Sequence, residues 1–457
     1  MRGGAARRMR LAVSLLRNEG ARAVLQRAAD RRDETTRRRS FSPAGSLPEV
    51  PVVNLLGTPP APRLGGVQTQ LLRRLADEAR FRAVALVYPD GPGLRVDVEH
   101  GTERRYRRFP RGNPQPGAVA DPAFEDALHE ILRQTGARAL HVENPAGLPA
   151  ESLARFAPSR PLLVSVHDFS PICPRTDLLE RPALAFCGYC ADDDRCARCL
   201  SPGVRAEAAF VREHRRASGA LLAAAAAAIF PSGFLRSALG TRVPGLDPAR
   251  LHVIAPDPPP ARGGARSPRP LRHVAFVGSV TPQKGSRVFA EIVRALAPRF
   301  PAVRWSAFGK GDAEELARLR RQGGIRISGY YRAGTLPEIL GRERVDLALA
   351  LSITPESYGL AVDECRSAGV PVLAFDHGAI AERLRARGGW LVDPGRGAAG
   401  AIETLAAVLA SGGAAKPPAA SSPGPAPRNA AALHLRVYRT LGLLPAEESG
   451  RPAATDA

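Results

Sequence analysis

The sequence is poor in lysine, in aromatic residues and in long apolar runs. Only Lys284, Lys310 and Lys416 are lysines among 65 basic residues, and aromatic residues make up 5% of the 457 positions. No apolar stretch reaches the roughly 18 residues that a membrane-spanning helix needs, and no signal-peptide pattern follows Met1. The sequence therefore predicts a cytoplasmic protein without a membrane-spanning helix.

The net charge of +21 comes almost entirely from arginine. A basic surface attracts polyanions, so nucleic acid and anionic membranes are the first partners to consider. The arginines are scattered, however, and they accompany 44 Gly, 43 Pro and abundant Ala, a bias that a GC-rich genome produces through codon usage. Scattered charge with few aromatic residues is unlike a nucleic-acid stacking surface, so we expect no nucleic-acid partner.

Length and periodicity predict an α/β protein with two domains. Short apolar runs alternate with helical patterns, which is typical of buried parallel strands joined by helices. The predicted strands of the first domain are Val52–Leu56, Arg82–Tyr88, Ala139–Val142, Pro161–Val166 and Ala228–Phe230, and those of the second are His273–Val277, Val303–Phe308, Ile325–Ile327, Val345–Ala350, Pro371–Phe375 and Trp390–Val392. Such doubly wound, Rossmann-like sheets bind ligands at the carboxyl ends of their strands. We therefore expect the active site in a cleft between the two facing domains.

Composition marks the predicted domain boundaries. Residues 1–48 carry twelve arginines and a helical pattern, and we expect a basic arm outside the main fold. The first domain is predicted at residues 49–255, and a segment rich in proline and glycine at residues 256–270 is predicted as the linker. Residues 271–411 are predicted as the second domain. Residues 412–457 are expected to hold a segment rich in proline and alanine, a short helix and a tail.

A glycine turn follows the strand His273–Val277 and leads into a helix. Gly278 and Ser279 form this turn, and Lys284 stands where the helix begins. Free backbone N–H groups and the helix dipole favour an anion at such a place, and an ammonium can neutralise the charge on a departing nucleotide. An ordinary strand-turn-helix unit with a surface lysine gives the same pattern. The turn at Gly309, after the next strand, carries less information by itself.

Two glutamates, Glu356 and Glu364, stand eight residues apart around the sequence Tyr358-Gly359-Leu360. If one helix includes both, their carboxylates lie about 12 Å apart. That separation exceeds the roughly 5 to 9.5 Å of a hydrolase carboxylate pair. Carboxylates accept hydrogen bonds from sugar and ribose hydroxyls, so the spacing favours contacts with the two ends of a nucleotide sugar.

Together these elements resemble the donor-binding domain of the retaining glycosyltransferase family four, which has the GT-B fold. The matching elements, in order, are Gly278 with Lys284-Gly285, Gly309 with Gly311, Glu356 with Glu364, Gly369 with Pro371-Val372, and Gly378 with Glu382. The resemblance implies that Lys284 contacts the diphosphate, Glu356 the donor sugar and Glu364 the nucleotide ribose.

The chain departs from the family pattern at Ser279, because the family usually has an arginine directly after the first glycine. Neutralisation of the diphosphate is then expected from Lys284 alone, or from a substitute such as Arg287 or Arg332.

The first domain contributes two further features of this resemblance. Gly65 and Gly66 open a helix after the first strand, as in the family's glycine loop that closes over donor phosphates, although a strand-to-helix turn also holds glycines for structural reasons. His167 follows the strand Pro161–Val166, where the family carries a histidine near the donor sugar. A lone histidine is usually structural, but in this context we predict that His167 positions the sugar and stabilises an oxocarbenium-like state.

Four cysteines, Cys187, Cys190, Cys196 and Cys199, follow at the spacing C-x2-C-x5-C-x2-C. The region resembles family members that build bacterial surface polysaccharides. Four thiolates can hold one structural zinc ion, which would leave no open position for catalysis; paired disulfides or reduced thiols are the alternatives. The run Asp192–Asp194 only superficially matches the metal motif of the other glycosyltransferase fold, because it lies in a cysteine loop. No catalytic metal is therefore expected.

The sequence thus predicts a retaining, hexosyltransferase-like glycosyltransferase that moves a sugar from a nucleotide diphosphate sugar to a hydroxyl acceptor. Synthesis of a cell-surface polysaccharide or glycolipid is the expected context. The sequence does not identify the acceptor, and a lipid-linked hydroxyl compound is one candidate. The alternatives are a GT-B epimerase or phosphorylase, and a zinc-bearing, arginine-rich nucleic-acid-binding protein. The basic arm favours peripheral contact with the inner face of the cell membrane; a codon-biased extension without that role is the alternative.

Overall fold

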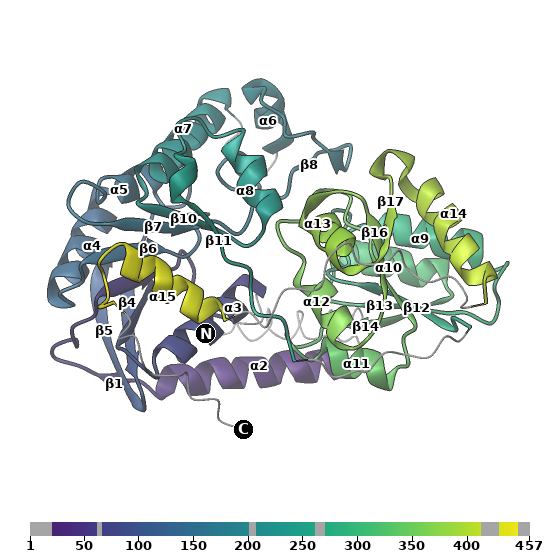
Figure 1. The fold of residues 1–457 in the computed structure, drawn as a ribbon, viewed down its shortest axis with the longest axis horizontal. Helices are drawn as coiled ribbons and strands as arrows, with labels where there is room; N and C mark the ends of the chain where they lie inside the picture. Colours follow the sequence, from purple (N-terminus) through teal and green to yellow (C-terminus); the bar gives the residue numbers. More distant parts are fainter. Residues whose placement is uncertain (1–20, 62–65, 201–206, 261–269, 413–428, 447–457) are drawn as a thin grey trace, which may run out of the picture.

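The chain folds into two α/β domains that face each other (Figure 1), as the sequence predicts. The structure is a computed structural model and describes residues 21–61, 66–200, 207–260, 270–412 and 429–446. Within these ranges, no helix has both the length and the apolar character needed to cross a membrane.

The first domain is built on a nine-stranded sheet with the order β1-β5-β4-β3-β2-β6-β7-β10-β11. Its strands are β1 (Ser42–Pro43), β2 (Val52–Leu55), β3 (Val84–Asp90), β4 (Gly93–His100), β5 (Glu103–Gly112), β6 (Ala139–Val142), β7 (Leu162–Ser165), β10 (Ala227–Phe230) and β11 (Leu251–Val253). From β3 through β2 to β11 all pairs are parallel, whereas β4 is antiparallel to both β3 and β5. The order reverses at β2, so the carboxyl ends of β2 and β6 open a crevice.

Helices cover both faces of this sheet (Figure 1). They are α3 (Gly66–Glu78), α4 (Pro122–Gln134), α5 (Ala150–Ala154), α7 (Ala208–Ala224) and α8 (Gly233–Gly240). In α4, the buried residues Phe124, Leu128 and Ile131 recur at helical spacing, and the Asp121 carboxylate caps the first turn by accepting from Phe124 N–H at 3.1 Å. In α8 the Ser232 hydroxyl caps the first turn in the same way, accepting from Leu235 N–H at 3.1 Å.

The second domain is a six-stranded sheet in the order β14-β13-β12-β15-β16-β17, with all neighbours parallel. Its strands are β12 (His273–Val277), β13 (Arg304–Phe308), β14 (Ile325–Gly329), β15 (Leu347–Ala350), β16 (Val372–Phe375) and β17 (Trp390–Val392), and its helices are α9 (Ser286–Leu296), α10 (Ala313–Gln322), α11 (Leu336–Arg342), α12 (Leu360–Ser367), α13 (Gly378–Arg387) and α14 (Gly397–Ala410). This is a doubly wound order, whose topological switch lies between β12 and β15.

Residues 21–39, predicted as part of an arm outside the fold, form the helix α2 (Ala21–Arg39) across both domains (Figure 1, purple). Near its C-terminal end, Arg37 pairs with Glu99 of the first domain at 3.3 Å. About one turn before Arg37, Asp33 pairs with Arg332 of the second domain at 2.6 Å. The prediction of a separate arm is therefore wrong for this helix, because its charged residues have partners on the folded domains. The rest of the helical pattern predicted near the N-terminus lies in residues 1–20, outside the described ranges.

The short helix predicted near the C-terminus is α15 (Ala430–Thr440), and it returns to the first domain (Figure 1, yellow). Tyr438 is completely buried there, with its hydroxyl 2.7 Å from His141 Nδ1 and 3.2 Å from Arg74 Nη1. The first domain therefore includes α15, in addition to residues 49–255.

Candidate active site

Lys284 and Glu356 form an ion pair where β12 and β15 end. The lysine stands in the turn before α9, and the Ser352 hydroxyl donates to the same carboxylate oxygen of Glu356. Burial by itself would raise the pKa of Glu356, but the charge and hydrogen bond of Lys284, with help from Ser352, lower it. The carboxylate is therefore ionised at neutral pH beside a cation, at the switch point of the sheet.

Glu356 lies in a loop and not in the helix that carries Glu364. The helix α12 begins at Leu360, because Gly359 adopts a left-handed conformation (φ 85°) that ends the preceding loop. The backbone oxygen of Glu356 accepts from Ala379 N–H at 2.9 Å, which ties the loop to the start of α13. The separation of about 12 Å calculated for a shared helix therefore does not apply.

Glu364 is 9% exposed on α12 and faces the loop between β14 and α11. Its carboxylate accepts from Gly334 N–H at 2.7 Å. Burial raises the pKa of Glu364 to about 7, and Asp363 adds to the rise, while the Gly334 N–H opposes it. At neutral pH this carboxyl group is thus divided between its protonated and ionised forms.

The two glycine turns of the second domain pack directly on one another. A Cβ atom on Gly309 would lie 1.8 Å from the backbone oxygen of Gly278, so the turns after β12 and β13 share one surface. Among the described residues, apart from Gly278 and its two neighbours in the chain, no atom lies within 4 Å of the place where a Cβ atom of Gly278 would stand. This leaves open space over the turn that contains Ser279.

Both arginines expected as substitutes at Ser279 have other partners. Arg287 pairs with Glu315 at 3.1 Å, and Arg332 pairs with Asp33 on α2. Lys284 is consequently the basic side chain that the structure brings to Glu356.

Tyr358 points into the second domain. Its hydroxyl donates to Asp363 at 2.7 Å, and the guanidinium of Arg383 lies 4.0 Å from the centre of its ring. The side chain therefore stabilises the segment between the two glutamates. Any donor contact at Tyr358 would come from its backbone.

Leu360 touches the first domain. A Cβ atom on Gly66 would lie 2.0 Å from Leu360 Cδ1, so the start of α3 packs directly against the start of α12 of the second domain. Gly65, predicted beside it, lies outside the described residues.

His167 follows β7 and is neutral at pH 7. Burial lowers its pKa to about 4, the charge of Arg74 lowers it further, and Asp168 opposes the shift. A neutral imidazole can donate one hydrogen bond and accept another.

A buried pair missed by the sequence analysis lies near His167. Arg74 on α3 pairs with Glu143, which directly follows β6, and burial raises the pKa of Glu143 to about 7. Glu143 follows its strand as His167 follows β7, so the rule that sites gather at strand ends could have found it.

Two hydrogen bonds join the domains near the loop that carries Glu356. The Ser232 hydroxyl donates to the backbone oxygen of Ser357 at 2.7 Å, and the carboxylate of Glu382 accepts from Phe234 N–H at 2.7 Å at the start of α8. The loop and helix that carry the predicted donor-binding residues of the second domain therefore contact the first domain directly.

The four cysteines of the predicted metal site line one small cavity of about 30 Å³, together with Cys173. The cysteine segment consists of β8 (Leu179–Glu180), β9 (Ala185–Phe186) and α6 (Asp193–Leu200). Arg215 donates to Cys196 Sγ at 3.2 Å. Among the residues that the structure describes, no three Cys, His, Asp or Glu side chains are arranged to hold a metal ion. The zinc site stays a prediction.

Two protein-family models, both for glycosyltransferases, match the chain. Residues 272–411 match the family model "Glycosyl transferases group 1", and residues 65–257 match "Glycosyl transferase 4-like domain". No curated protein matches the sequence.

Solved structures share the fold at low identity. Anabaena Alr3699/HepE in complex with UDP and glucose is 15% identical, with a TM-score of 0.53 over 87% of this chain and 100% of that one. Sucrose-phosphate synthase from Thermosynechococcus elongatus is 17% identical, with a TM-score of 0.60 over 86% and 99%. The structural likeness gives the GT-B fold, and the two family matches give the class: this protein is a GT-B glycosyltransferase.

Proposed function

We propose that the protein is a retaining glycosyltransferase that moves a sugar from a nucleotide diphosphate sugar to a hydroxyl acceptor, in cell-surface polysaccharide or glycolipid synthesis. The observation that carries this proposal is the Lys284–Glu356 ion pair at the switch point of the second sheet. The cation suits a diphosphate, and the ionised carboxylate suits the hydroxyls of the attached sugar.

In the proposed reaction the acceptor hydroxyl attacks the anomeric carbon on the face from which the nucleotide leaves. The bond from this carbon to the phosphate oxygen breaks, the bond to the acceptor oxygen forms, and the acceptor proton passes to the departing phosphate. Lys284 and the N–H groups at the start of α9 stabilise the charge that develops on the diphosphate. Glu356 holds the sugar, and the neutral imidazole of His167 orients it by hydrogen bonding.

We assign the contact with the nucleotide ribose to Glu364, because it is a buried carboxylate beside the loop after β14 and can accept hydrogen bonds from ribose hydroxyls. HepE has been solved with UDP and with UDP-glucose. Sugars linked to UDP are therefore the first donors to test.

The test is a thermal-shift screen with UDP, GDP, ADP and TDP and their sugars, followed by NMR of the product's anomeric linkage. A ligand at 100 times its Kd should stabilise the protein by about 2.7 kcal/mol. The proposal expects one nucleotide series to do this and the product to keep the donor's anomeric configuration. An inverted product, or no stabilisation by any nucleotide, would contradict it.

For localisation, we propose a cytoplasmic protein that contacts the inner face of the cell membrane through the basic residues before α2. Lipid-linked acceptors lie at that surface, and arginines are attracted to its anionic headgroups.

A further inference from the structure

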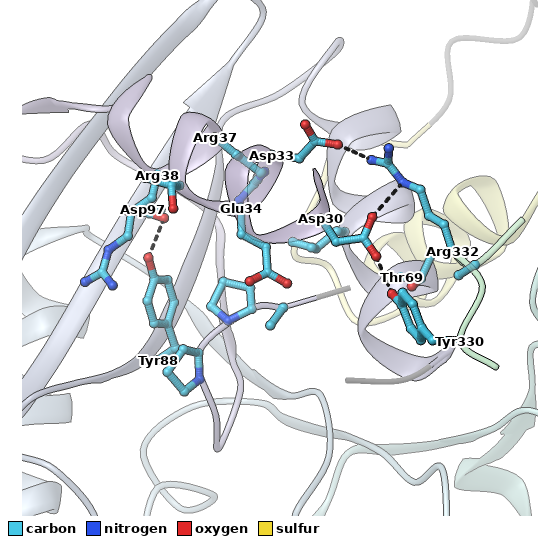
Figure 2. A pocket seen from close by; sticks show the side chains of 16 residues that line it. Asp30, Asp33, Glu34, Arg37, Arg38, Thr69, Tyr88, Asp97, Tyr330 and Arg332 are labelled. Carbon is cyan, nitrogen blue, oxygen red and sulfur yellow. Dashed lines mark hydrogen bonds and ion pairs between the residues drawn. The ribbon is translucent and has the colours of Figure 1, made fainter. Parts of the chain in front are cut away.

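A cavity of about 550 Å³ lies between α2 and both domains (Figure 2). This volume is within the range of small-molecule sites, roughly 300 to 1,000 Å³. Its lining comes from the C-terminal half of α2, from the first domain around Pro59, Thr69 and Tyr88, and from the second domain at Tyr330 and Arg332. Three separate parts of the protein therefore build one pocket.

Two tyrosines stand on opposite sides of this cavity, and the Glu34 side chain lies between them in Figure 2. The Tyr88 hydroxyl donates to Asp97 at 2.7 Å, and the Tyr330 hydroxyl donates to Asp30. Because each ring is buried and held by a carboxylate of another element, both walls are fixed before a ligand arrives.

The cations of the lining are already paired with carboxylates. Arg37 pairs with Glu99, and Arg38 pairs with Asp90 outside the lining. Arg332 is held by Asp33 at 2.6 Å and lies 3.5 Å from Asp30. An anionic ligand would have to compete for these arginines.

The carboxylates of the lining favour a different ligand. Glu34 lines the middle of the cavity, with Asp30 and Asp97 at its sides. Asp30 and Asp97 already accept from Tyr330 and Tyr88, and Asp97 also pairs with Arg95 at 2.6 Å. A carboxylate has about four lone-pair sites, so these groups can accept further hydrogen bonds and, with Glu34, suit the hydroxyl donors of a neutral saccharide better than a phosphate or an acidic sugar. The prolines and Leu72 supply apolar surface for the faces of sugar rings.

On each domain, lining residues of the cavity lie close along the chain to residues of the proposed donor site. Its wall at Ala333 is followed directly by Gly334, whose N–H bonds Glu364. On the other side, Thr69 is three helical residues, about 4.5 Å of rise, from Gly66, which touches Leu360 at the start of α12. A long ligand in the cavity could therefore extend toward the donor.

We propose that this cavity binds a neutral, hydroxyl-rich saccharide portion of the acceptor, so that α2 is part of the acceptor site. The inference rests on the proposed function and adds to it the chemical class of the acceptor.

The test compares two bulky substitutions on adjacent exposed residues of α2. Thr35 lines the cavity and Thr36 does not, so Thr35→Trp should fill the site while Thr36→Trp serves as the matched control. Calorimetry on the full chain with saturating UDP would use methyl glycosides of glucose, galactose, mannose and N-acetylglucosamine and their disaccharides, with glucuronic acid as the anionic probe. We expect at least one neutral glycoside to bind the wild type, and Thr35→Trp to weaken that binding at least tenfold. Thr36→Trp should leave it unchanged.

Glu34→Gln tests the chemistry of the site without blocking it. Saccharide binding should weaken severalfold in this variant, while UDP affinity stays as in the wild type. The inference is overturned if Thr35→Trp and Thr36→Trp bind the glycosides equally well, if glucuronic acid binds best, or if the wild type binds UDP but no neutral glycoside. Failure of the wild type to bind any nucleotide would instead sink the proposed function, and this inference with it.

Discussion

The ammonium of Lys284 contacts the carboxylate of Glu356, joining the turn after β12 to the loop after β15. The lysine side chain is 29% exposed and the glutamate side chain 15%. A donor that engages both groups must therefore exchange part of this ion pair for contacts with its diphosphate and its sugar. The pair orients both groups before the donor binds, at the cost of breaking part of it.

Substituting each partner of the ion pair in turn should show that the pair contributes both to stability and to sugar transfer. Lys284→Ala leaves a partly buried carboxylate unpaired, so we expect a loss of about 1–3 kcal/mol of unfolding free energy, between the values for exposed and buried ion pairs. Transfer should fall about 100-fold or more in Lys284→Ala and in Glu356→Gln. The double variant should recover stability without recovering activity, as measured by denaturant unfolding and a transfer assay.

The control for this pair of variants is Arg133→Ala, which removes an exposed ion pair with Glu130 at 2.6 Å. Wild-type turnover in both single variants would remove Lys284 and Glu356 from the donor site.

Ionisation of Glu364 should lower the stability of the ligand-free protein but favour donor binding. Its pKa rises from an ordinary 4.5 to about 7 in the folded protein, so the fold binds the proton more tightly than the unfolded chain does. Its contribution to stability is therefore present below pH 4.5 and lost as the pH rises through 7, a loss of about 3 kcal/mol. The groups around it are Asp363, Tyr331 and the Gly334 N–H.

Glu364→Gln should consequently be more stable than the wild type at pH 8 without ligand, and about equally stable at pH 5. The same variant should bind UDP more weakly, because an amide accepts ribose hydrogen bonds less strongly than a carboxylate. Melting curves from pH 5 to 8, with and without UDP, measure both effects. A variant with unchanged UDP affinity would contradict the ribose assignment.

The sequence predicted the parallel strands of both sheets because most of them are continuous buried apolar runs, as in β12 and β15. It missed β5, since half of the residues in Glu103–Gly112 are arginine and few of them are buried, and its pairing with β4 depends on tertiary context. It also treated the arginines of α2 as a solvated arm. Their partners, such as Glu99 and Asp90, lie more than fifty positions away along the chain.

Motif spacing predicted Lys284, Glu356 and Glu364 as site residues, and their roles stay predictions. The geometry expected around them was wrong, because a left-handed Gly359 starts the helix after Glu356. The Arg74–Glu143 pair and the cavity under α2 require the folded positions of distant segments, which spacing does not contain.

His167→Ala should lower kcat more than it changes nucleotide affinity, because we place His167 at the sugar. Its pKa of about 4 predicts no titration step from this residue between pH 6 and 8. His167→Asn, which keeps a hydrogen-bonding group, should recover part of the rate. His252→Ala on the edge strand β11 is the control. An effect on UDP affinity alone would move His167 away from the sugar.

The basic segment before α2 should bind anionic vesicles. A truncation to Pro48 would also remove α2, so the sharper variant replaces Arg2, Arg7, Arg8 and Arg10 with Gln in the full chain. At about 1 kcal/mol per arginine near the headgroups, flotation with phosphatidylserine or cardiolipin vesicles should fall strongly at low salt. Equal recovery of the variant and the wild type would dismiss this contact.

The last prediction is that Cys187, Cys190, Cys196 and Cys199 bind one structural zinc ion. The four cysteines already line one cavity, and its volume of about 30 Å³ has room for a single small occupant. Burial raises the pKa of the Cys196 thiol, while Arg215 opposes that rise and would stabilise the thiolate that a metal requires.

Because zinc must displace thiol protons, its affinity should increase with pH. Elemental analysis of protein purified without added metal should show close to one zinc per chain. Cys187→Ser and Cys199→Ser should lose the metal, and Cys365→Ala, buried in the other domain, should keep it. Chelation should lower the melting temperature, since the metal holds β8, β9 and α6 together. Protein that contains no zinc, with its thiols freely titratable in the native state, would reject the site.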